Sequence, residues 1–183
     1  MTRFFTIVLM ETNFLEIIRT RRSCRSYKPE QITDEQLNNV LEAGTYAPTS
    51  RGMQSPFIVA VQNKDLLARL AKMNAEVMGV DFNPYYDAPT YVLVFVPADA
   101  PNGVQDASLV LENMMLAAHA QGLGSCWIHR EKEIFATEEG KELMKQWGLP
   151  VGLVGIGALS LGYPASEPSP AKPRKEGYTR VIR

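Results

Sequence analysis

Arg21-Arg22-Ser23-Cys24-Arg25 places three guanidinium groups and one hydroxyl within five residues. A guanidinium group is planar, stays charged at working pH and can donate to two phosphate oxygens at once. The chain as a whole is nearly neutral, with 19 basic and 20 acidic side chains, so this cluster is a local feature. Its pattern is typical of an anion-binding site, and equally of a solvated basic end of a helix, where cations are also favoured.

A second basic segment lies near the C-terminus. Five basic residues fall between Arg19 and Lys28, and five more fall between Lys172 and Arg183. These two short segments hold more than half of the 19 positive charges of the chain. If folding brings the segments together, they form one anion site.

Other residues with chemical potential are less convincing. Cys24 could act as a nucleophile if the surrounding charge favoured its thiolate, but no catalytic base accompanies it, so a structural cysteine is the better interpretation. The two histidines, His119 and His129, lack a set of partners at ligand spacing, and we predict no metal site. Gly155-x-Gly157 imitates a dinucleotide-binding motif, but no helix follows it, which argues against that motif. The sequence also lacks a Gly-x-Ser-x-Gly nucleophile motif.

Two more segments could line a ligand site. Ala47–Pro56 is rich in turn formers and small polar residues and is predicted to be a loop. Gly122–Ile128 combines glycines with Trp127, which fits either a wall for a planar aromatic ligand or a buried strand that begins with a core tryptophan.

Size and composition bound the class of protein. A chain of 183 residues, 45% hydrophobic and 21% charged, is typical of one globular domain. A pI near 6.2 argues against a nucleic-acid-binding protein. Two cysteines indicate a reducing cytoplasm. The apolar run 4–10 is too short for a membrane span, so we expect residues 1–12 to form an N-terminal extension before one domain, 13–183.

The elements that must position these residues follow from hydrophobic periodicity and capping signals. We predict a first helix capped by Asn13, a second that begins with the capping box Thr33–Gln36 and ends at Gly44, and an all-round apolar helix that must be buried on every side, in part by a second subunit. The other predicted elements are strands over 57–61, 91–96, 126–128 and 151–161, helices over 66–77, 106–121 and 135–147, and an extended tail from Pro164. This irregular order favours the α+β class.

Taken together, the chain resembles the flavin-dependent nitroreductase family from about Phe14 to its C-terminus. Four motifs in order carry the resemblance, and only the ordered set is specific: Arg21-Arg22-Ser23-Cys24-Arg25-Ser26-Tyr27, Ala47-Pro48-Thr49-Ser50-x-x-x-Gln54, Gly122-Leu123-Gly124-Ser125-Cys126-Trp127-Ile128, and Lys172-Pro173-Arg174. The resemblance implies a mainly antiparallel central sheet flanked by helices, an intertwined homodimer, and FMN held at the subunit interface.

The resemblance also implies roles for individual residues. Arg21, Arg22, Ser23 and Arg25 would contact the phosphate, ribityl chain and pyrimidine edge of FMN, and Lys172 and Arg174 would complete the phosphate site. Pro48, Thr49, Ser50 and Gln54 would approach the same flavin from the partner subunit. Trp127, Ile128 and His129 would cover one flavin face. Gly52 departs from the family, which often has Asn there, so one side-chain contact of the second motif is in doubt.

The implied activity is an oxidoreductase in which the cofactor carries the chemistry and no catalytic side chain is needed. NADH or NADPH would deliver a hydride to flavin N5, and a small oxidised acceptor, nitroaromatic or quinone, would then receive it by a ping-pong mechanism. The alternatives are other flavin chemistry on this scaffold, such as reductive dehalogenation or a flavin-consuming reaction, and a non-catalytic nucleotide-binding module. The resemblance implies neither a nucleic-acid nor a membrane partner.

Overall fold

A four-stranded sheet forms the centre of the fold in the computed structural model, which describes residues 14–183. Its strands are β1 (Phe57–Val61), β2 (Thr90–Pro97), β3 (Gly124–Ile128) and β4 (Leu153–Gly162). The strand order is β1-β2-β4-β3, and every pairing is antiparallel. The predicted α+β class with an antiparallel sheet is confirmed.

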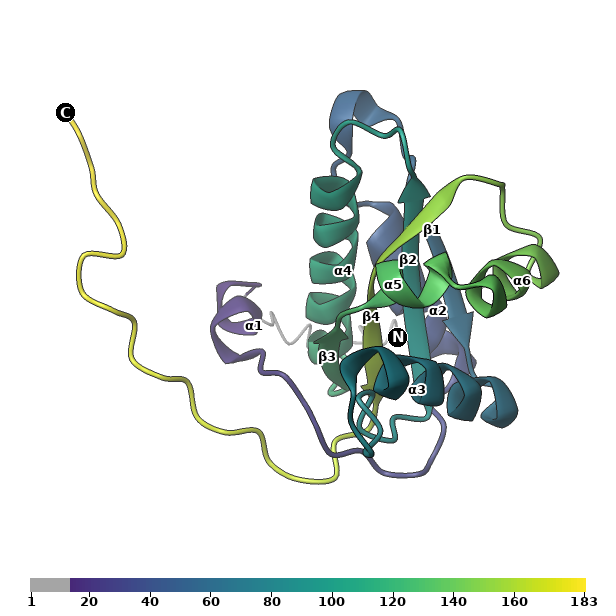
Figure 1. Ribbon diagram of the computed structural model, residues 1–183. Helices are drawn as coiled ribbons and strands as arrows, with labels where there is room; N and C mark the ends of the chain where they lie inside the picture. Colours follow the sequence, from purple (N-terminus) through teal and green to yellow (C-terminus); the bar gives the residue numbers. More distant parts are fainter. Residues whose placement is uncertain (1–13) are drawn as a thin grey trace, which may run out of the picture.

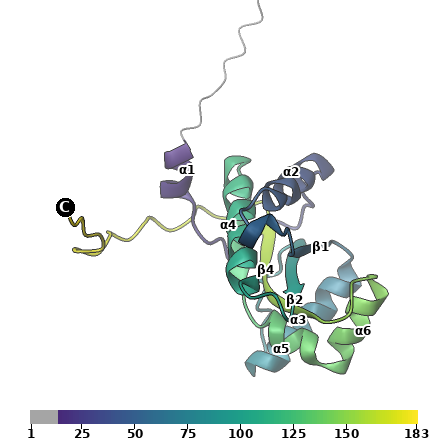
Figure 2. The same ribbon diagram turned by 90° about the horizontal axis from the view of Figure 1, so that it is seen from above.

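Helices cover both faces of this sheet. One layer consists of α2 (Asp34–Thr45) and α4 (Gly103–Ala120), and the other consists of α3 (Lys64–Met78), α5 (Glu131–Ala136) and α6 (Glu138–Gln146), with the sheet between them (Figure 2). In β2, Leu93 and Phe95 belong to the core under α3, α5 and α6, whereas Val92 and Val94 belong to the core under α2 and α4. A strand buried on both faces reads as a continuous apolar run, which is why this one is visible in the sequence.

The helix boundaries confirm one prediction and correct another. Thr33 and Gln36 form the predicted capping box at the start of α2. Gly44, however, does not end this helix, because α2 continues to Thr45. The glycine instead lets α2 approach α4, since a Cβ atom at Gly44 would lie 2.9 Å from Cγ of Met114.

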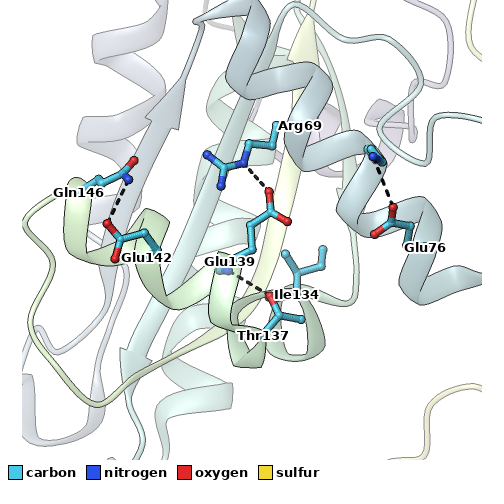
Figure 3. Close-up of polar contacts among 9 residues, drawn as sticks. Arg69, Glu76, Ile134, Thr137, Glu139, Glu142 and Gln146 are labelled. Carbon is cyan, nitrogen blue, oxygen red and sulfur yellow. Dashed lines mark hydrogen bonds and ion pairs between the residues drawn. The ribbon is translucent and has the colours of Figure 1, made fainter.

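The helix predicted over 135–147 is two helices. Thr137 adopts an extended conformation between α5 and α6 and caps α6 by accepting a hydrogen bond from the backbone N–H of Gly140, 3.0 Å away. Arg69 of α3 forms an ion pair with Glu139 of α6, which joins two helices of the same layer (Figure 3). A threonine inside an apolar helical pattern does not by itself signal such a break.

The helix α1 (Phe14–Thr20) and the C-terminal tail stand apart from the three layers, on the same side of the molecule (Figure 1). No residue of α1 is buried, and residues 165–183 are exposed and form neither helix nor strand, as predicted for the tail. The predicted cap at Asn13 and the extension 1–12 lie outside the described residues. Within residues 14–183, no helix is both long and apolar enough to cross a membrane.

The apolar helix α4 is not buried on every side of the single chain. Its residues Ala107, Leu111 and Met114 are fully buried, but Val104 and Leu109 are 60% and 44% exposed. The single chain thus leaves part of this helix exposed, and the burial of that side by a second subunit stays a prediction.

Candidate functional site

The arginine cluster is fixed along the sheet edge formed by β3. Immediately after α1 the chain turns beside this strand, where Ser23 pairs with Ser125 and the backbone N–H of Cys24 donates to the carbonyl of Ser125 over 2.9 Å. Further along, Tyr27 pairs with Pro164, two residues after the end of β4. An edge strand offers unpaired backbone groups, so this short stretch both covers the edge and gains its own hydrogen bonds.

The three guanidinium groups of the cluster are held differently. Nη1 of Arg22 donates to the carbonyls of Arg19 and Arg21, at 2.7 and 2.6 Å. Nε of Arg25 donates to the hydroxyl of Tyr86 at 3.3 Å. Nη1 of Arg21 is buried and has no hydrogen-bond partner among residues 14–183.

A buried donor without an acceptor costs free energy, so the orphaned nitrogen of Arg21 suits an acceptor supplied by a ligand. A phosphate oxygen is the acceptor that guanidinium geometry fits best. The residues present at this position therefore fit the phosphate of FMN.

One open pocket of about 350 Å³ collects the basic residues of both chain ends. It is lined by Arg21, Arg22, Ser23, Arg25, Lys172 and Arg174, together with residues 169–171. Its lining holds five positive side chains and not one carboxylate. Residues of both basic segments thus line the same pocket, while their role in holding FMN stays a prediction.

His119 lies beside the arginine cluster. Burial lowers the pKa of His119, and the nearby charges of Arg21 and Arg22 lower it further. Its Nε2 lies 2.8 Å from Oγ1 of Thr20, which places the C-terminal end of α4 next to the start of the arginine cluster.

The second motif lies at the other end of α4. The backbone N–H of Ser50 donates to Oδ1 of Asp106 at 3.0 Å, and Oγ of Ser50 accepts from Asn102 at 2.8 Å. Thr49 accepts from the backbone N–H of Gln54 at 2.9 Å. These bonds hold the predicted loop, which contains one short 3₁₀ turn (Ser50–Gly52), against the first turn of α4.

The two motifs therefore cannot share one small ligand within a single chain. Asp106 and His119 mark the two positions along α4, and 13 residues of helix at 1.5 Å each span about 20 Å. Residues Pro48, Thr49, Ser50 and Gln54 do not line the pocket of Arg21. Gly52, in the same loop, has a φ of +66° and open space around its missing Cβ. Glycine and asparagine tolerate that φ best, so the departure at Gly52 creates no steric conflict.

The third motif is β3 and its C-terminal end. The side chain of Ile128 is buried in the core, and the indole of Trp127 packs over Gly157, whose Cβ would lie 2.7 Å from Nε1. His129 is exposed, and its carbonyl accepts from the side chain of Asn74 at 3.1 Å. The side chains of Trp127 and Ile128 thus pack in the core, and the role of this stretch at the flavin stays a prediction.

Cys24 packs against Gly124, and Cys126 is buried in the core. A Cβ at Gly124 would lie 2.7 Å from Sγ of Cys24, so the glycine makes room for that thiol. Burial raises the pKa of Cys126, which keeps its thiol protonated. In residues 14–183, no cluster of three or more His, Cys, Asp or Glu side chains could hold a metal ion.

Gly155 and Gly157 lie inside β4 and not in a phosphate-binding turn. A Cβ at Gly155 would lie 2.7 Å from the carbonyl oxygen of Glu131, so close packing explains this glycine. The rejection of a dinucleotide-binding motif agrees with this geometry.

Two further residues were not among the site residues predicted from the sequence. Tyr86 contacts Arg25, and the fully buried Glu131 accepts a hydrogen bond from the hydroxyl of Tyr85 at 3.0 Å. Burial raises the pKa of Glu131 to about 7. A weak signal existed for Glu131, which shares a helix face with the apolar Ile134 and Phe135, but Tyr86 had no signal beyond its place in a turn-rich stretch.

Comparisons with known proteins identify the relatives of this chain. The sequence matches the family model described as Nitroreductase family over residues 18–81 and 78–163. A solved nitroreductase with bound FMN from Bacteroides fragilis is similar with a TM-score of 0.86 and 30% sequence identity, over 93% of this chain and 99% of that one. An NADPH-flavin oxidoreductase of Vibrio harveyi is 28% identical over 92% of this chain and 72% of its own length. An oxygen-insensitive NADPH nitroreductase of Salmonella typhimurium is 26% identical over 87% of this chain and 69% of its own.

Proposed function

The chain belongs to the nitroreductase family, and we propose that it is an FMN-dependent NAD(P)H oxidoreductase that reduces a small nitroaromatic or quinone acceptor by a ping-pong mechanism. The observation that carries this proposal is the basic pocket of the arginine cluster, in which a buried nitrogen of Arg21 lacks an acceptor among the described residues. FMN carries one phosphate. Solved structures of nitroreductases similar to this chain include some with FMN bound.

The phosphate of FMN would bind to Arg21, Arg22, Lys172 and Arg174, with Ser23 as a neutral donor. Arg25 would reach the ribityl chain or the pyrimidine edge. Donors of fixed position stabilise negative charge without reorganising, so the same groups favour electron uptake by the bound cofactor. Bound FMN supplies the centre that accepts a hydride from NAD(P)H and passes it on.

The remaining residues of the site would come from a second copy of the chain. Pro48, Thr49, Ser50 and Gln54 lie about 20 Å along α4 from the arginine cluster, so a homodimer is needed to bring both motifs to one FMN. The exposed side of α4 and the exposed apolar residues of α1, such as Phe14 and Ile18, offer the surface for that contact. The backbone of Trp127, Ile128 and His129 would border one flavin face. We place the enzyme in the cytoplasm.

A purified preparation tests the function directly. We expect a yellow protein with the absorbance bands of bound FMN, and NADH or NADPH oxidation that rises when a nitroaromatic or a quinone is added. Varying both substrates should give the parallel double-reciprocal lines of a ping-pong mechanism. A colourless protein that takes up no added FMN would contradict the proposal and favour a non-catalytic module.

The variant Arg21→Ala tests the phosphate site. A hydrogen bond to a charged group contributes about 1.5–3 kcal/mol, so FMN affinity should fall at least about tenfold. Arg180→Ala is the matched control, because Arg180 is an exposed tail residue that does not line the pocket. Equal FMN affinity in Arg21→Ala and the unmodified protein would refute this assignment.

A further inference from the structure

Among residues 14–183, the side chain of Arg25 forms a hydrogen bond with one other side chain, that of Tyr86, which lies 61 positions away in the sequence. We propose that Tyr86 is a positioning residue that holds the guanidinium group of Arg25 in the orientation needed to bind FMN. This inference rests on the proposed function, because it assigns Arg25 to the FMN site.

Two contacts join these side chains. Nε of Arg25 donates to the hydroxyl of Tyr86 at 3.3 Å, and the guanidinium carbon lies 5.8 Å from the centre of the tyrosine ring. A cation within about 6 Å of an aromatic face is attracted to it. The hydrogen bond that Arg25 donates to Tyr86 is also the main cause of the raised pKa of Arg25.

The loop that carries Tyr86 is built to hold one position. Tyr86 and Asp87 both have left-handed backbone conformations, with φ values of 57° and 55°. Such conformations are unfavourable for residues with side chains and persist only where the surroundings enforce them, often at functional sites. Here Asn83 enforces the turn, since its amide nitrogen donates to Oδ1 of Asp87 at 2.8 Å and its Oδ1 accepts from the backbone N–H of Tyr85 at 2.9 Å.

The core anchors the same loop from below. The buried ring of Tyr85 stacks on Tyr91 with 4.0 Å between the ring centres, and the carbonyl of Tyr85 accepts from Oγ of Ser160 at 2.8 Å. The half-buried Tyr86 is therefore presented from a rigid base, and the long and exposed Arg25 side chain rests against it.

The need for such a partner follows from the other arginines of the cluster. Arg22 is already fixed by two backbone carbonyls, whereas Arg25 has no backbone carbonyl partner among residues 14–183. An exposed arginine loses much rotamer freedom when it binds a ligand. Fixing the side chain in advance lowers that loss and raises affinity, which is the advantage of preorganisation.

A double-mutant cycle with Arg25→Ala and Tyr86→Leu tests this role, with the FMN dissociation constant measured by flavin fluorescence. Tyr86→Leu should raise the constant about threefold to tenfold in the unmodified background. In the Arg25→Ala background, the same change should have an effect of less than about twofold, because residues that act through one another are not additive. Tyr86→Phe keeps the ring and loses only the hydroxyl. Its FMN dissociation constant should therefore lie between that of the unmodified protein and that of Tyr86→Leu.

Phe82→Leu is the matched control, since it removes an exposed aromatic side chain from the same loop and should leave FMN affinity unchanged. Equal effects of Tyr86→Leu in both backgrounds, or none in either, would overturn the positioning role while leaving the proposed function intact. An equal loss in Phe82→Leu would also overturn it, because the loop and not Tyr86 would then be responsible. If Tyr86→Leu unfolds, Tyr86→Phe in both backgrounds gives the same cycle for the hydroxyl alone. Failure of the unmodified protein to bind FMN would overturn both proposals.

Discussion

Glu131 is a single carboxyl group whose burial couples stability to pH. It is 0% exposed, one oxygen accepts from Tyr85, and the other has no partner among the described residues. Removing a charge from water is costly, so burial favours the protonated acid and raises its pKa from the ordinary value of 4.5 to about 7.

The direction of the pH effect follows from this shift. Below pH 4.5 the group is protonated in both the folded and the unfolded chain, so its titration does not change the free energy of unfolding. Between pH 4.5 and 7 the unfolded chain releases the proton and the folded chain keeps it, so stability falls as pH rises. Relative to Glu131→Gln, the free energy of unfolding should fall by about 2–3 kcal/mol between pH 5 and pH 8.

Urea unfolding of both proteins at the two pH values measures this difference. Other titrating groups affect both proteins alike, so the difference isolates Glu131. Glu142→Gln, at an exposed position of α6, should show no such change with pH. A difference between Glu131→Gln and the unmodified protein that is the same at pH 5 and pH 8 would contradict the burial argument.

Contacts between residues far apart in the sequence mark the limit of what the sequence predicts about the site. The arginine cluster, the 47–54 motif and Lys172 with Arg174 could be picked out because each is a local run with a composition of its own. The contacts between Arg25 and Tyr86 and between Tyr85 and Glu131 join residues 61 and 46 positions apart, and only the folded topology brings such pairs together.

The elements show the same contrast. The strand β1 and the capping box of α2 follow from local patterns, namely an apolar run between turn formers and Thr three residues before Gln. The break at Thr137 and the place of Gly44 inside α2 depend on what packs beside them, which local patterns do not contain.

The junction of α5 and α6 yields a prediction of unusual sign. Replacing glycine by alanine inside a helix ordinarily stabilises it by about 0.5–1 kcal/mol. At Gly140, however, a Cβ atom would lie 2.3 Å from the carbonyl oxygen of Ile134 and 2.6 Å from Cα of Phe135. Because both are backbone atoms, the two helices must separate, and Gly140→Ala should destabilise the protein by about 1–3 kcal/mol.

Urea denaturation gives this value, and Lys145→Ala is the matched control on the same helix. Lys145 is exposed, so its change should stay within about 0.5 kcal/mol. A stabilised Gly140→Ala variant would show that α5 and α6 do not pack as closely as described.

For the whole molecule, α4 keeps the two halves of the proposed site apart. In a two-fold symmetric dimer, each site would then combine Arg21 of one subunit with Gln54 of the other. A hybrid of an Arg21→Ala subunit and a Gln54→Ala subunit has one site with both changes and one site with neither.

Mixing these two variants under conditions of subunit exchange should therefore restore FMN binding. With random assortment about a quarter of all sites become intact. The measurement is FMN bound at a concentration where each variant alone binds little, and a mixture of each variant with itself is the control. Binding in the mixture that equals the average of the two separate variants would contradict a site shared between subunits.

In the proposed dimer, the separation of Asp106 and His119 along α4 would also couple the retention of the cofactor to the concentration of the protein. If each FMN lies between two chains, whatever separates the chains also releases the cofactor, and each equilibrium shifts the other by the same free energy. Dilution alone would then release FMN from the enzyme, and added FMN would favour the association of the subunits. The abundance of the protein in its cell would set the fraction of active sites that exist.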